Sequence, residues 1–102
     1  DIDIIGEAEV RIAKTHEAAV REYADSVMGR YRTRNAPTGS RVELETLVER
    51  NWIGTVDEVV HKIGAAKEAG LEHVNALHLA ADSMQERLAQ MQVFAEEVMP
   101  RV

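Results

Sequence analysis

Hydrophobic and polar positions divide the chain into helical segments and one strand-like run. From residue 7 to about residue 31, apolar residues recur at three- and four-residue steps, which predicts one long amphipathic helix. A loop at residues 34–40, with Pro37 and Gly39, follows it. We therefore expect a single segment that has a long helix and loop over residues 1–40 and a helix, helix, strand and helix over residues 41–102.

Three capping-box spacings, each a Ser or Thr followed three residues later by Glu, predict where the later helices begin. They are Ser40 with Glu43, Thr55 with Glu58, and Ser83 with Glu86. Gly70 is placed to end the second of these helices, and Pro100 the last. The last helix is predicted to face inward with an apolar stripe of Met84, Leu88, Met91, Ala95 and Val98, flanked by Phe94.

The stretch "LEHVNALHL", residues 71–79, is too short for another helix after a Gly stop. Its apolar residues fall on both faces, which favours a central parallel strand, buried over about residues 72–79. A buried strand needs neighbours, and the chain offers only "DIDII", residues 1–5, and "NWI", residues 51–53. The pattern therefore predicts the end of a larger alternating α/β structure.

Composition excludes several classes of function. A net charge of −6 disfavours nucleic acid as a partner, because phosphate binding depends on Lys and Arg. The basic stretch "RYRTRN", residues 30–35, fits a complement to the helix dipole or ion pairs better than a nucleic-acid site. There is no Cys, so we expect a reducing, cytoplasmic location. No apolar run approaches the roughly 20 residues that span a bilayer, so we expect a soluble protein with no membrane partner.

The second half of the chain contains three motifs: "IGTVDEV" from Ile53, "AGLEHV" from Ala69 and "MQVFAEEVMP" from Met91. Together they resemble the C-terminal end of bacterial luciferase-like, flavin-dependent monooxygenases. Val56 stands where that family usually has Pro. All three motifs consist of caps and packing residues, so they indicate a position in a fold and no catalytic residue.

The resemblance implies the C-terminal portion of a (β/α)8 barrel, a fold of about 250 residues, so we expect the chain to be part of a larger polypeptide. It also implies an oxidoreductase or monooxygenase that uses FMN or a deazaflavin on a small organic substrate, with a flavin reductase as a possible partner. This segment would close the barrel. The alternative is an autonomous, non-enzymatic helical interaction or oligomerisation domain. Exposed strand edges predict a homo-oligomer if the chain stands alone.

The candidate cofactor-binding residues are Gly54, Thr55 and His78. Gly54 and Thr55 begin a helix whose free backbone donors can hold a flavin phosphate, although a capping box explains them equally well. His78 lies near the carboxyl end of the predicted strand, where barrel enzymes place their sites, or else packs at the barrel mouth. Period-two alternation puts His73 and His78 on opposite faces, so we expect no metal site.

Overall fold

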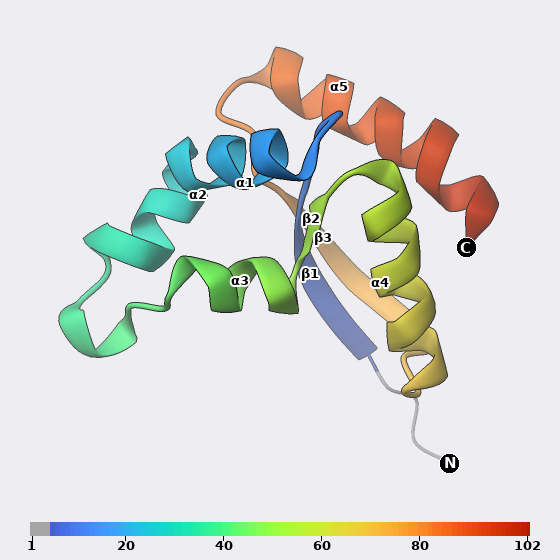
Figure 1. Ribbon diagram of the computed structural model, residues 1–102, viewed down its shortest axis with the longest axis horizontal. Helices are drawn as coiled ribbons and strands as arrows, with labels where there is room; N and C mark the ends of the chain where they lie inside the picture. The colour runs from blue at the N-terminus through green and yellow to red at the C-terminus, as the bar shows by residue number, and fades with distance from the viewer. Residues whose placement is uncertain (1–4) are drawn as a thin grey trace.

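Three parallel strands with helices on both faces form an α/β fold (Figure 1). The computed structural model describes residues 5–102. Its strands are β1 (Ile5–Ile12), β2 (Trp52–Gly54) and β3 (His73–Leu79). Its α-helices are α1 (His16–Asp25), α2 (Val27–Arg30), α3 (Leu44–Arg50), α4 (Val56–Glu68) and α5 (Met84–Val93). Four short turns complete it: the π-helical η1 (Tyr31–Asn35) and η3 (Phe94–Val98), and the 3-10 helical η2 (Thr38–Ser40) and η4 (Met99–Arg101).

Strand β1 replaces the first part of the predicted long helix, so that prediction was wrong. From Gly6 to Ile12 polar and apolar residues alternate strictly, which is the period of a half-buried strand. Val10 and its apolar neighbours on that face are buried. The helix begins only at His16, where the Thr15 hydroxyl accepts a hydrogen bond from the Ala18 N–H at 3.1 Å.

The strand order is β2-β1-β3, with β1 in the middle. Strand β1 pairs with β3 over six residue pairs, and β2 pairs only with Val10–Ile12 at the end of β1. The predicted strand after Gly70 is confirmed, and so is the left-handed conformation of Gly70, with φ 111°. Its predicted burial is wrong. Val74 and Leu77 are 41% and 38% exposed, because β3 has β1 on one edge and no other described strand on its second edge. Residues 1–4 of the expected neighbour "DIDII" lie outside the described part, whereas "NWI" does contribute to β2.

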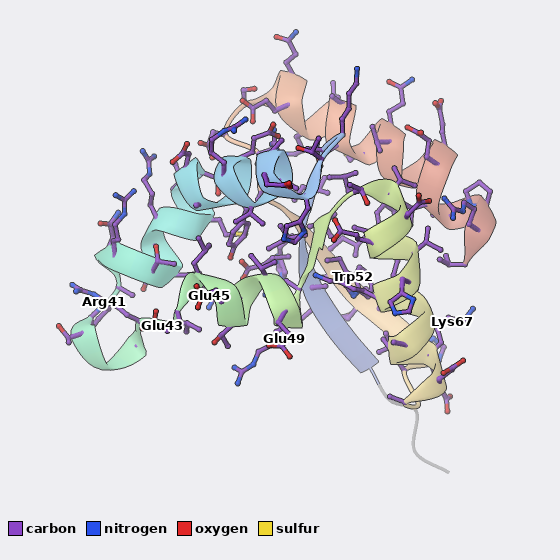
Figure 2. All side chains as sticks on the ribbon, viewed as in Figure 1. Arg41, Glu43, Glu45, Glu49, Trp52 and Lys67 are labelled. Carbon is purple, nitrogen blue, oxygen red and sulfur yellow. The ribbon has the colours of Figure 1, made fainter. Side chains whose placement is uncertain are left out.

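Two hydrophobic clusters lie on the two faces of the sheet. The first joins Val10 and Trp52 to Val59 and Ile63 of α4 and to Phe94 of η3. Trp52 stacks on Phe94 with ring centroids 6.4 Å apart, and Figure 2 shows it between the strands and α4. The second cluster joins the sheet to α1 and α3 and comprises Ala19, Tyr23, Leu47, Ile53 and Ala80. In Figure 1, α1, α2 and α3 accordingly lie on the opposite side of the strands from α4.

The capping predictions have different outcomes. At Thr55 both hydrogen bonds of the capping box with Glu58 form, which confirms that helix start. The Ser83 hydroxyl accepts from the Glu86 N–H, but the Glu86 carboxylate turns to Arg11, 3.2 Å away. Ser40 instead ends the turn η2, and α3 begins after Glu43 without a side-chain cap, so the first predicted box was wrong.

Helix α5 presents a different side to the core from the predicted one. Of the predicted stripe, Met84, Leu88, Met91 and Ala95 are exposed, whereas Val98 and the flanking Phe94 are buried as predicted. Gln90, which was not predicted to face inward, is buried as well. Gln90 is drawn inward by the end of β1: its carbonyl oxygen accepts from Ile12 N at 2.8 Å and its amide donates to Ile12 O at 2.9 Å. No helix within residues 5–102 is long and apolar enough to cross a membrane.

Candidate functional site

A groove lies beside β3 in the described part of the chain, and we call it the β3 groove. It has a volume of about 1060 Å³. One wall is formed by Val27, Met28 and Tyr31 of α2 and η1, and the other by Met91, Phe94 and Met99 of α5, η3 and η4. Leu77, His78 and Leu79, the carboxyl half of β3, form its floor. The site predicted from His78 therefore lies in an apolar channel that two helical segments create beside β3, whose second edge carries no described strand.

Both walls contain a π-helical turn. In η1 the Ala36 N–H donates to Tyr31 O at 2.9 Å, and in η3 the Met99 N–H donates to Phe94 O. Such turns are rare and occur frequently at functional sites, because the wider turn shifts side chains away from the regular helical positions. Tyr31 and Phe94, which begin the two turns, both line the groove.

Polar side chains at the groove come from three elements and one loop. They are Arg32 of η1, His78 of β3, Asp82 of the loop after β3 and Arg87 of α5. The Asp82 carboxylate accepts a hydrogen bond from Val27 N at 3.1 Å, which joins that loop to α2. His78 Nε2 lies 3.4 Å from a Glu7 carboxylate oxygen. Every buried side-chain N or O among residues 5–102 has a hydrogen-bond partner, so the groups left for a ligand are these accessible ones.

Behind Arg32 lies a buried polar cluster that positions it. The Tyr23 hydroxyl donates to Glu9 Oε1 at 2.5 Å, and the Arg32 guanidinium lies 2.8 Å from Glu9 Oε2. Burial raises the pKa of Tyr23, and the hydrogen bond to Glu9 and its charge raise it further. The phenol therefore stays protonated and donates to the carboxylate. The cluster fixes η1 against β1 and leaves Arg32 half-exposed at the groove.

Arg11 makes a second polar junction on the same face of β1. Its guanidinium lies 2.8 Å from Glu22 of α1 and 3.2 Å from Glu86 of α5, and it donates to Ala80 O at 2.9 Å. Together with Glu9 it gives the face of β1 opposite Val10 a charged character. These residues were missed in the sequence because residues 7–31 were interpreted as a helix, although the alternation of "EAEVRI" was the signal that identifies them.

The other two candidate residues lie elsewhere. Gly54 ends β2 and Thr55 caps α4, on the opposite side of β1 from His78, and neither lines the β3 groove. Thr55 N donates to the Glu58 carboxylate at 2.9 Å, so the chain's own acid occupies this helix start. A phosphate there would meet that negative charge. The phosphate role of Gly54 and Thr55 stays a prediction, and the structure does not bring these residues together with His78.

A bulge in β3 corrects the predicted placement of the two histidines. Val74 pairs with Gly6 and Ala76 with Glu7, which leaves Asn75 as an extra residue. His73, paired with Ile5, and His78, paired with Glu9, therefore point to the same face. Within the described part, no group of three or more His, Asp or Glu side chains is placed to hold a metal ion.

Comparison with known proteins adds no family. No protein-family model and no curated protein matches this chain.

The groove itself defines the chemistry available: apolar walls that exclude water, two arginines that can bind an anion, and one histidine that can donate or accept a proton.

Proposed function

We propose that this chain is the C-terminal part of a luciferase-like, flavin-dependent oxidoreductase, and that the flavin lies in the β3 groove. The observation that carries the proposal is the groove itself, about 1060 Å³ in volume, at the carboxyl half of a parallel strand. Cofactor sites are typically clefts of roughly 300–1,000 Å³ with apolar walls and a few polar groups. In open α/β sheets they lie beyond the carboxyl ends of the strands.

The barrel that the proposal requires is supported by one strand pair. Strands β1 and β3 run parallel over six residue pairs that one bulge interrupts, and neighbouring barrel strands are also parallel. Helices α4 and η3 pack on one face of this pair, which would be the outside of the barrel. The three-residue β2 lies at the end of β1 and is not a barrel strand in this proposal.

The residues of the groove match the parts of a flavin. Tyr31, Met91 and Phe94 offer flat or flexible apolar surface to the ring, and Arg32 and Arg87 offer positive charge to a phosphate. A bound FMN or deazaflavin would supply the redox chemistry, and the chain would orient it and exclude water. His78, held near Glu7, is the titratable group closest to the floor of the groove.

Flavin binding tests the proposal. FMN is titrated into the protein and its fluorescence is followed, with a deazaflavin as a second probe. Arg87→Gln should weaken FMN binding about tenfold, because one charge-assisted hydrogen bond is lost. Arg30→Gln is the matched control, since Arg30 is exposed on α2 and does not line the groove. Absence of saturable binding, or equal affinities for the two variants, would contradict the proposal.

A second candidate function is association, favoured by the edge of β3 on which no described strand is paired. An edge strand next to an apolar groove is a surface for another strand. Both candidates use the same groove, so flavin binding and the oligomeric state distinguish them.

A further inference from the structure

On one edge of β3 no described strand is paired, and β3 lacks the residues that usually prevent an edge strand from pairing with another chain. Its seven residues, "HVNALHL", include no Lys, Arg, Asp, Glu or Pro. Natural edge strands are usually protected by such residues or by a covering element. Here Val74 and Leu77 are exposed, and the adjoining groove is apolar. This edge therefore has the properties of one that pairs with a further strand.

The bulge at Asn75 makes the corresponding side chains of the two halves of β3 point to the same faces of the sheet. Because Asn75 is the extra residue, Val74 and Leu77 both point to the face that carries α4, being paired with Gly6 and Ala8. His73 and His78 both point to the other face. Reading inward from His73, and inward from His78 in the other direction, the strand then presents a histidine, an aliphatic residue and a small residue in that order. Without the bulge, the two aliphatic side chains would lie on opposite faces.

We infer that a second copy of this chain pairs antiparallel along β3, across a two-fold axis between Asn75 and Ala76. A two-fold axis perpendicular to the sheet reverses the strand direction, so the pair is antiparallel. Residues opposite each other in such a pair point to the same face. Val74 then lies opposite Leu77 of the second copy, and His73 opposite its His78. The two sheets join into one continuous sheet, and the exposed aliphatic residues become cross-strand pairs.

The distribution of charged residues around β3 supports a second copy of this chain as its partner. Among the charged side chains that line the groove at the carboxyl half of β3, Arg32 and Arg87 outnumber Asp82, and the exposed Glu72 directly precedes the amino half of the strand. Antiparallel pairing brings the amino half of one copy beside the carboxyl half of the other. Each acidic end therefore approaches a groove that carries two arginines, and β3 adds no like charge between them.

The inference deepens the association function, the second candidate above, and does not depend on flavin. Sedimentation equilibrium of the 102-residue chain should give twice the 11.4 kDa of the monomer. Val74→Lys and Leu77→Lys should each give monomers, because each places a charge at the strand edge opposite an apolar residue. Leu88→Lys is the matched control: Leu88 is 57% exposed on α5 and outside the groove, so this variant should stay dimeric. Circular dichroism of all three variants verifies that they fold.

The register can be tested separately by disulfide cross-linking of introduced cysteines, because the chain contains no Cys of its own. Variants His73→Cys and His78→Cys are oxidised separately and as a mixture. Opposite residues have Cβ atoms about 4.5–5.5 Å apart, close to disulfide range. A disulfide-linked dimer should form mainly in the mixture, between one copy of each variant. Cross-linking that is equal in all three samples overturns the register and leaves association standing. A monomeric wild-type chain overturns both the register and the association. If that monomer binds FMN, the groove is assigned to the flavin function.

Discussion

The two sides of strand β1 differ in how completely the apolar residues beside it are buried. On the side of β2 and α4, Val10, Ile53 and Val59 are completely buried. On the side of β3 and α5, residues of the same hydrophobicity, such as Val74, Met84 and Leu88, are exposed. Apolar spacing predicts which residues share a face, whereas burial also requires an element opposite that face. The first side has such elements within the described chain, whereas no described element covers Val74, Met84 or Leu88 on the second side.

The largest expected effect is on the packed side. Trp52→Ala removes the ring that stacks on Phe94 and contacts α4, so the free energy of unfolding should fall by about 3–5 kcal/mol. Urea denaturation followed by far-UV circular dichroism measures this loss.

The matching change on the open side is Leu88→Ala on α5. Because Leu88 is exposed, the free energy of unfolding should change by less than about 0.5 kcal/mol. A loss comparable with that of Trp52→Ala would mean that α5 is covered in solution, and the comparison between the two sides would fail.

The predictions that hold are those that local chemistry determines. The helix after Thr55, its stop at Gly70 and the strand over residues 73–79 follow from a capping box, a left-handed glycine and the length of a short apolar run. Strand β1 was missed because its alternating residues also fit helical spacing when they are joined to Ala19 and Tyr23 of α1. Thr15, the cap that separates the two periods, was the overlooked signal.

The candidate site was less predictable because it depends on contacts between distant segments. His78 was placed correctly at the carboxyl half of a strand, but the groove beside it needs α2 and α5. Glu9 is buried only because Tyr23 and Arg32 reach it from α1 and η1. The bulge at Asn75 exists only in the pairing of β3 with β1, so no pattern within β3 predicts that His73 and His78 share a face.

A smaller effect is expected at the helix caps. Thr55→Ala removes the acceptor for Glu58 N at the start of α4 and should lower the free energy of unfolding by about 1 kcal/mol. Ser40→Ala is the control, because Ser40 has the same sequence spacing to a Glu but caps no helix. Its effect should stay within about 0.5 kcal/mol. Equal losses in thermal or urea unfolding would show that α3 has a cap like that of α4.

The smallest effect is a change in pH dependence at Glu58. Burial raises the pKa of this carboxyl, but the Thr55 N–H, His16 and Lys62 outweigh burial, and the pKa lies below its ordinary value of 4.5. A carboxyl with a lowered pKa in the folded state stabilises the fold fully above the ordinary value, and this contribution disappears as the pH falls through the folded-state pKa. Glu58→Gln should therefore be less stable than the wild type at pH 7, and the difference should shrink as the protein is acidified below 4.5. His16→Gln, which removes the side chain 2.9 Å from Glu58, should reproduce part of this change. A stability difference that is the same at pH 7 and in acid would show that Glu58 acts through hydrogen-bond geometry alone, because glutamine can also accept from Thr55 N at that helix start.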